Sequence, residues 1–192
     1  DNLRLFVRDD VDAVIVDCAT CGSSLKNEYI HILRDLKELG ENVTDEEIKA
    51  AELLSAKIQD VSFFIDLHKE WLPEIKPNGE KIRVTYHDPC HLAKAQSVRA
   101  QPRNILKSIP NVEYVEMNGA DDCCGGGGSF QIDYPENSAK ITKRKTDNIE
   151  ATKAQFCATG CPGCTLTISN HLDPTIKVIH TVQILQQALE RS

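Results

Sequence analysis

Short apolar runs alternate with helix-like segments along most of this chain. The runs resemble "VDAVIV" in being brief and apolar, whereas the segments between them carry helical patterns. Such alternation generates a parallel sheet covered by helices. We therefore expect strands at residues 11–16, 82–87, 112–117, 155–158 and 176–179, and helices at residues 23–39, 102–109, 135–151, 162–171 and 181–190.

A segment rich in proline and glycine, "LPEIKPNGEK", marks a boundary near residue 80. The four strands after it predict an α/β domain over residues 80–192, a Rossmann-like parallel four-stranded sheet with helices on both faces. Residues 1–79 contain one predicted strand and several helices. One helix runs from the capping-box sequence "TDEE" to about residue 58, and another covers residues 61–70. One strand is too little to close a sheet of its own.

Charge and hydropathy exclude two classes of function. A net charge of −7 and a pI near 5.4 argue against binding to a phosphate backbone, so we expect no nucleic-acid partner. The apolar runs are far shorter than the roughly 20 residues of a membrane-spanning helix, and no secretory signal precedes them. We therefore expect a soluble chain that does not cross a membrane itself.

Eight cysteines are many for a chain of 192 residues without a secretory signal. In a reducing cell this density indicates metal or redox chemistry rather than disulfides. Five of them follow predicted strands of the second domain, and the carboxyl ends of parallel strands meet at one sheet edge. Two thiolates roughly 4 Å apart repel by about 4 kcal/mol at an effective dielectric near 20, so a cation must sit among them. These five are Cys90, Cys123, Cys124, Cys161 and Cys164.

The spacing and surroundings of the five cysteines resemble a known family. The motifs "YHDPCHL", "CCGGGGSF" and "TGCPGC", with "QPR" and "VIHTVQIL", are similar in order and distance to the cysteine-rich CCG domain over residues 82–190. That domain occurs in the B and D subunits of heterodisulfide reductase and in the iron–sulfur subunits of glycolate oxidase and lactate oxidation systems. The resemblance implies that the five thiolates bind a noncubane [4Fe–4S] cluster. Gly125 and Gly126 would let backbone N–H groups approach its sulfurs and tune its potential.

Three histidines are expected near the same sheet edge. His87 and His91 flank Cys90, and His180 follows the last predicted strand. For each of them, a hydrogen-bonded or structural role beside the ligands is favoured over ligation. Because cysteine and histidine are both common zinc ligands, a structural zinc site is the main alternative to the cluster.

Other features have simpler interpretations. The glycine run could cradle a phosphate, but no Lys-Ser/Thr follows it. "CPGC" alone could be a redox dithiol at a helix start, which leaves three further cysteines without a purpose. Cys157 lies within a predicted strand and is interpreted as a small buried apolar residue. A basic helix face, either solvated or a docking site for an electron-transfer partner, is formed by Lys140, Lys143, Arg144 and Lys145.

Cys18 and Cys21 lie in "VIVDCATCGSSLK", which repeats the order of strand, CxxC and helix in "FCATGCPGCTLTI". Since members of the family carry two such domains in tandem, the resemblance implies that residues 1–79 are a truncated remnant of a first repeat plus connecting helices. We expect a C-terminal fragment of a longer chain, with ferredoxin-type clusters before the first repeat. Cys18 and Cys21 would form a partial site without a cluster, and the exposed strand edge would promote self-association.

The resemblance implies an iron–sulfur electron-transfer subunit of an oxidoreductase complex. The complex would oxidise a 2-hydroxy acid, glycolate or lactate in type, at a flavin in a partner dehydrogenase subunit. "CCGGGGSF" and "CHLAKAQ" are closer to the glycolate and lactate group. The alternatives are a heterodisulfide reductase subunit that uses the cluster for disulfide reduction, and a zinc-stabilised assembly module. We expect a cytoplasmic location, with membrane attachment only through partner subunits, and no catalytic residue on this chain.

Overall fold

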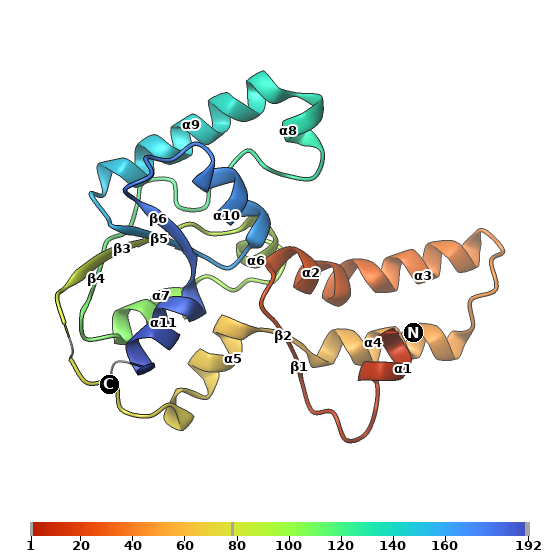
Figure 1. The fold of residues 1–192 in the computed structure, drawn as a ribbon. Coiled ribbons are helices and arrows are strands. Elements are labelled where there is room, and N and C mark those ends of the chain that lie inside the picture. Colours follow the sequence, from red (N-terminus) through yellow and green to blue (C-terminus); the bar gives the residue numbers. More distant parts are fainter. Residues whose placement is uncertain (1, 78, 191–192) are drawn as a thin grey trace.

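The computed structural model describes residues 2–77 and 79–190 as an α/β protein (Figure 1). Its main sheet has four parallel strands in the order β4-β3-β5-β6, which confirms the predicted fold class. The strands are β3 (Ile82–Tyr86), β4 (Val112–Tyr114), β5 (Phe156–Thr159) and β6 (Lys177–His180). Residues 1, 78 and 191–192, at the ends of the predicted domains and in the predicted linker, lie outside the described residues.

Helices cover both faces of the main sheet because its strands point apolar side chains alternately into two cores (Figure 1). On one face, Cys157 of β5 shares a core with Ile168 of α10. On the other face, Val84 of β3 shares a core with Leu106 of α7. The first face is covered by α9 (Pro135–Ala151) and α10 (Pro162–Ser169), and the second by α5 (Val61–Leu67), α7 (Ala100–Ser108) and α11 (Thr181–Glu190).

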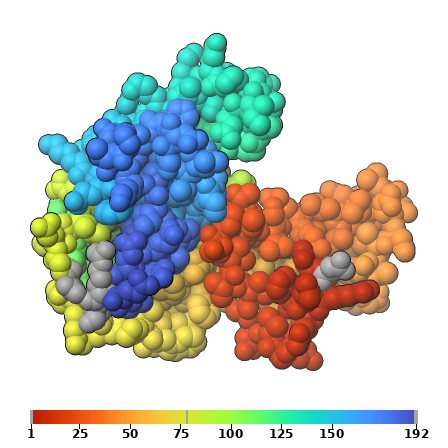
Figure 2. Space-filling view, in the orientation of Figure 1, coloured from red at the N-terminus to blue at the C-terminus, as the bar shows by residue number. Residues whose placement is uncertain are grey.

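The N-terminal part builds a second, two-stranded parallel sheet from β1 (Val14–Val16) and β2 (Ile58–Asp60). The sequence analysis placed only one strand here and was wrong on this point. β2 directly follows a helix, and its three residues are too few to show an apolar period of their own. Helices α3 (Tyr29–Glu38) and α4 (Asp45–Lys57) pack together and project away from the main sheet, as Figure 2 shows in orange.

Several helices begin and end where sequence signals placed them. α9 and α11 have the predicted bounds, and Thr44 and Glu47 form the predicted capping box of α4. The helix predicted over residues 23–39 starts earlier, at Ala19, and is interrupted by a π-helical segment, Ser24–Glu28. No helix within the described ranges is both long and apolar enough to cross a bilayer. The short elements that were not predicted are α1 (Asn2–Phe6), α6 (Cys90–Ala93), α8 (Phe130–Asp133) and a 3-10 turn, Lys69–Trp71.

The predicted basic face of α9 is smaller than expected. Lys140, Lys143 and Arg144 are exposed, but Lys145 is only 1% exposed. Because side chains three and four positions apart point to the same side of a helix, Lys145 lies on the side of α9 that also buries Thr142 and Ile149. The prediction that Lys145 belongs to a solvated surface was therefore wrong.

Candidate functional site

A cavity of about 90 Å³ lies at the carboxyl edge of the main sheet. Its walls come from three loops, those that follow β3, β4 and β5. All five cysteines of the predicted site line it, one from the first loop and two from each of the others: Cys90, Cys123, Cys124, Cys161 and Cys164. The parallel topology thus brings thiols from distant parts of the sequence into one small space.

Cys161 and Cys164 are held by the first turn of α10. Cys161 is the N-cap residue, and Pro162 occupies the first helical position, where its missing N–H is not needed. The pKa of Cys161 is lowered to about 5, chiefly by hydrogen bonding with Cys164 and also by the backbone N–H groups of Cys164 and Gly163. The start of α10 therefore favours a thiolate at Cys161.

A buried polar network fixes the loops that carry Cys90 and the vicinal pair. The carboxylate of Asp88, two residues before Cys90, receives two hydrogen bonds from Arg103, at 2.8 and 2.7 Å. The backbone N–H of Asp88 donates to the carbonyl of Ala120 at 3.0 Å. Lys145 donates to the carbonyls of Gly119 and Ala120 at 2.5 and 3.2 Å. The buried lysine therefore anchors the loop that leads to Cys123 and Cys124.

The glycines after the vicinal pair allow close packing against two helices. Gly125 has φ +91°, and a Cβ there would lie 2.8 Å from the carbonyl oxygen of Ser138 on α9. A Cβ on Gly126 would overlap the hydroxyl oxygen of Thr167 on α10. The N–H of Gly125 donates to the sulfur of Cys123 at 3.3 Å, and Gly126 lines the cavity. Glycine is thus required here for packing as well as for backbone approach to sulfur.

The thiols cannot all ionise together without a cation. The sulfurs of Cys124 and Cys164 are 3.5 Å apart. Hydrogen bonding with Cys123 and Cys164 lowers the pKa of Cys124, whereas the pKa values of Cys123 and Cys164 are raised, chiefly by their hydrogen bonding with Cys124. Protonated and ionised sulfurs therefore alternate across the cavity, which is a donor set suited to a soft, positively charged group.

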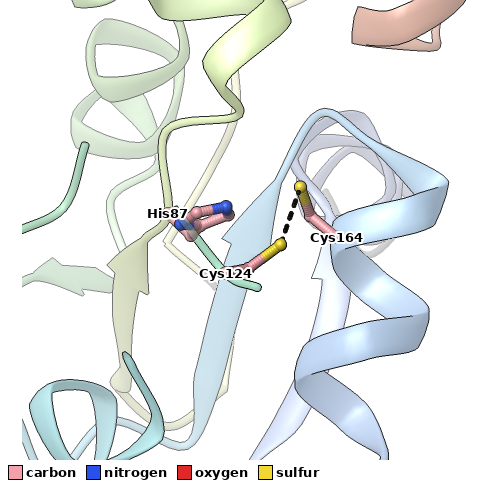
Figure 3. Close-up of side chains that lie close together, drawn as sticks. All are labelled: His87, Cys124 and Cys164. Carbon is pink, nitrogen blue, oxygen red and sulfur yellow. Dashed lines mark hydrogen bonds between the residues drawn. The ribbon is translucent and has the colours of Figure 1, made fainter. Parts of the chain in front are cut away.

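His87 points into this cavity beside Cys124 and Cys164 (Figure 3). One ring nitrogen and the two sulfurs lie within 4.8 Å of one another, and this proximity also helps to lower the pKa of Cys124. The side chain is buried, and neither ring nitrogen has a partner in hydrogen-bond geometry among the described residues. The sequence analysis expected a hydrogen-bonded histidine here, and the structure corrects that expectation. Only the adjacency of His87 to the Cys90 loop had indicated a place near the site.

The other predicted neighbours lie at different distances from the cavity. His91 lines it, with Nδ1 3.7 Å from the sulfur of Cys90 and 3.4 Å from the hydroxyl of Thr20. Thr20, which the sequence analysis did not single out, also lines the cavity, and its hydroxyl lies 3.6 Å from the sulfur of Cys161. His180 is not part of the lining, and its Nε2 lies 2.9 Å from the carbonyl oxygen of Asp17.

The three remaining cysteines lie outside the cavity lining. Cys21 is exposed, and its backbone N–H donates to the sulfur of Cys18 at 3.5 Å. Cys157 is fully buried in the core, as predicted, and this burial raises its pKa to about 12. Cys157 is therefore a neutral core residue, whereas Cys18 and Cys21 form a separate pair on the N-terminal part.

Comparison with known proteins gives one family and several relatives. The family model described as "Cysteine-rich domain" (CCG) matches residues 84–169. The B subunit of the CoM/CoB fumarate reductase from Methanothermobacter marburgensis is 35% identical over 92% of this chain and 32% of its own length. The probable glycolate oxidase iron-sulfur subunit of Bacillus subtilis is 33% identical over 97% of this chain and 41% of its own length.

A third relative is matched over more of its length. Lactate utilization protein A of Oceanobacillus iheyensis is 31% identical over 90% of this chain and 67% of its own length. By contrast, the chain spans only 30 to 41% of the length of the first four curated relatives. These matches confirm the resemblance found in the cysteine motifs. The chain belongs to the cysteine-rich domain (CCG) family.

Proposed function

We propose that this chain is part of an iron–sulfur subunit of an oxidoreductase, and that the five cavity cysteines are the cluster ligands. The observation that carries the proposal is the common cavity of Cys90, Cys123, Cys124, Cys161 and Cys164. Thiolates are the usual ligands of iron–sulfur clusters, and close thiolates are stable only around a cation. The name of the Bacillus relative, a glycolate oxidase iron-sulfur subunit, supports the same function.

The chemistry of the cavity fits a cluster in two further respects. The ring of His87 is buried without a partner, so a bound group would complete its hydrogen bonding. Gly126, Gly127 and Gly128 line the cavity without side chains that would fill it. The cluster, when bound, supplies one-electron redox chemistry. The chain's own residues hold it, restrict water and set the charge around it.

Five thiols are one more than the usual four cluster ligands. Two of them, Cys123 and Cys124, are adjacent in the sequence and both line the cavity. This donor set supports a noncubane [4Fe–4S] cluster, the type that the CCG motif implies. His91, Gly125, Gly126 and His180 are proposed to act beside the ligands, with His180 acting at the greatest remove because it contacts Asp17 outside the cavity.

The substrate is proposed to be a 2-hydroxy acid, glycolate or lactate in type, oxidised at a flavin in a partner subunit. The names of two relatives, the glycolate oxidase subunit and lactate utilization protein A, support this class. In such a complex this chain relays electrons and binds no substrate. The name of the Methanothermobacter relative, which belongs to a CoM/CoB fumarate reductase, favours the alternative of thiol and disulfide chemistry at the same centre.

The N-terminal part repeats the order of the second half of the main sheet. β1 ends at Val16, and Cys18 follows two positions later. β5 ends at Thr159, and Cys161 likewise follows two positions later. In each case the second cysteine of a CxxC motif lies in the helix that begins there.

The strand pairing repeats as well. The last residue of β1, Val16, pairs with Asp60, and the last residue of β5, Thr159, pairs with His180. Both partner strands then lead directly into a helix. This repetition supports the assignment of residues 1–79 to the end of a first CCG repeat plus connecting helices, and of residues 80–192 to a complete second repeat. Cys18 and Cys21 would then belong to a first site of which this chain holds only part.

A zinc centre is the second candidate, because His87, Cys124 and Cys164 already offer three ligand atoms within 4.8 Å of one another. A fourth ligand from Cys161 would complete a Cys₃His set, which is common in structural zinc sites. This candidate predicts a stabilising module without redox function. It leaves Cys90 and Cys123 without a role.

Anaerobic reconstitution of the whole chain distinguishes the two candidates. We expect about four iron atoms and a similar amount of sulfide per chain. A chain in which Cys18 and Cys21 are both replaced by serine is the control and should bind the same amounts. Tight uptake of one zinc with no sulfide would contradict the cluster. Reconstitution must exclude air, because exposed clusters are labile to oxygen.

A further inference from the structure

The imidazole of His87 is the buried polar side chain that the cavity leaves least explained. It is only 1% exposed, and both ring nitrogens lack a hydrogen-bond partner among the described residues. Leaving a buried polar group unpaired costs about 1–3 kcal/mol, so native proteins rarely do so without a reason. A group that binds in the cavity would remove this cost.

The backbone holds this ring firmly in place. The N–H of His87 donates to the carbonyl of Ala158 on β5 at 2.9 Å, which extends the pairing of β3 with β5. The next residue, Asp88, is fixed by the paired hydrogen bonds from Arg103. His87 therefore presents its ring to Cys124 and Cys164 from a rigid part of the sheet edge (Figure 3).

We propose that a ring N–H of His87 donates a hydrogen bond to a sulfur of the bound cluster, on the side held by Cys124 and Cys164. This inference rests on the proposed function. Donation is favoured over ligation because five thiolates already outnumber the four irons, so no iron needs a nitrogen ligand. His87 is then a positioning residue that tunes the cluster and takes no part in holding it.

A hydrogen bond to a cluster sulfur stabilises the more negative, reduced state more than the oxidised state. It therefore raises the reduction potential. Replacing His87 by leucine removes the donor and keeps a side chain of comparable bulk. We expect the ratio of reduced to oxidised cluster at a fixed ambient potential to fall about tenfold, which for one electron corresponds to about 59 mV. His87→Gln, whose amide retains an N–H donor, should restore most of the lost potential.

The test uses the whole chain, reconstituted without air, with iron and sulfide measured in every sample. Potentiometric titration followed by EPR gives the potential of wild type, His87→Leu, His87→Gln and a control, His31→Leu, which changes an exposed histidine of α3. Pulsed EPR on protein labelled with ¹⁵N-histidine measures the coupling between cluster and imidazole. We expect a weak coupling that is lost in His87→Leu and kept in His31→Leu.

Each alternative outcome contradicts a different statement. A loaded His87→Leu chain with the wild-type potential and coupling would overturn the hydrogen bond and leave the proposed function intact. A strong coupling of the size of a metal-bound nitrogen, or failure of both His87 variants to bind a cluster, would show that His87 is a ligand. A wild-type chain that binds no iron and sulfide would overturn the proposed function and this inference with it.

Discussion

The backbone N–H of Ala19 donates a hydrogen bond of 3.0 Å to the carbonyl of Gly160. These residues belong to the two CxxC loops, which are therefore joined directly. The same contact lets Thr20 reach the cavity, where its hydroxyl lies 3.6 Å from the sulfur of Cys161. The N-terminal part thus supplies one wall of a site whose cysteines all come from the second domain.

Replacing Ala19 by proline tests this junction. Ala19 is the first residue of α2, and Pro162 occupies the corresponding place in α10, so proline suits the local backbone. The substitution removes the N–H that bonds Gly160. We expect the free energy of unfolding to fall by about 1 kcal/mol or more, measured by urea denaturation of the metal-free chain. Pro162→Ala is the control and should change stability less, and equal stabilities of wild type and Ala19→Pro would show that the junction is energetically unimportant.

The glycine loop gives a second prediction with a control next to it. Gly125→Ala forces a side chain into a left-handed backbone with φ +91° and against the carbonyl oxygen of Ser138. We expect a loss of about 3 kcal/mol in the free energy of unfolding. Gly127→Ala places its Cβ where no atom lies within 4 Å and should cost little. Thermal or chemical denaturation of both variants decides the matter, and similar losses for the two would contradict the packing explanation.

Asp60 makes stability depend on pH. Burial raises the pKa of this carboxyl, even though it accepts hydrogen bonds from the N–H groups of Ser62 and Phe63 at the start of α5. A raised pKa in the folded state means that stability is greatest at low pH and falls as pH rises through the folded pKa. Asp60→Asn keeps a capping oxygen and removes the titration. We therefore expect its stability relative to wild type to increase from about pH 4 to about pH 7, the interval above the ordinary carboxyl pKa.

The control for Asp60 has the opposite sign. Asp45 is exposed, and its hydrogen bond with Lys37 lowers its pKa. Its contribution is present at neutral pH and is lost as pH falls through the folded pKa. Asp45→Asn should therefore lose stability relative to wild type as pH rises over the same interval. Urea denaturation at several pH values gives both slopes, and equal slopes for the two variants would contradict the burial of a charged Asp60.

The sequence was sufficient to predict the main sheet and the gathering of thiols at its edge, because both follow from alternation and from the position of cysteines after strands. It was not sufficient for β2, whose three residues carry no period. The burial of Lys145 also escaped prediction, since its acceptors are carbonyl groups 25 and 26 residues earlier in the chain. Charge alone had suggested a surface position.

The site shows the same limit. The cysteine motifs identify the sulfurs from local spacing, but Thr20 reaches Cys161 across 141 positions in the sequence. The unpartnered state of His87 depends on what surrounds its ring in three dimensions, which no spacing encodes. Contacts between distant segments were therefore the part of the site that required the structure.

Cluster binding should distinguish two buried cysteines that differ only in place. Cys124 lines the cavity, whereas Cys157 lies in the core of β5 with its pKa raised to about 12 by burial. We expect Cys124→Ser to abolish the cluster, and Cys123→Ser to do the same. Cys157→Ala should retain wild-type amounts of iron and sulfide after anaerobic reconstitution. A folded Cys157→Ala chain without a cluster would show that the ligands have been wrongly assigned.

The free edge of β1 predicts self-association. β1 pairs with β2 on one side, and no strand of residues 2–77 or 79–190 pairs with its other side. Ile15, in the middle of β1, is 41% exposed, so both unpaired backbone groups and apolar surface are available to a second copy. We expect reversible dimers in sedimentation experiments as concentration increases. Because a charge on an edge strand opposes such pairing, Ile15→Lys should shift the chain towards monomer, while Leu166→Lys, at an exposed position of α10, should not. A wild-type chain that stays monomeric at high concentration would contradict an open edge at β1.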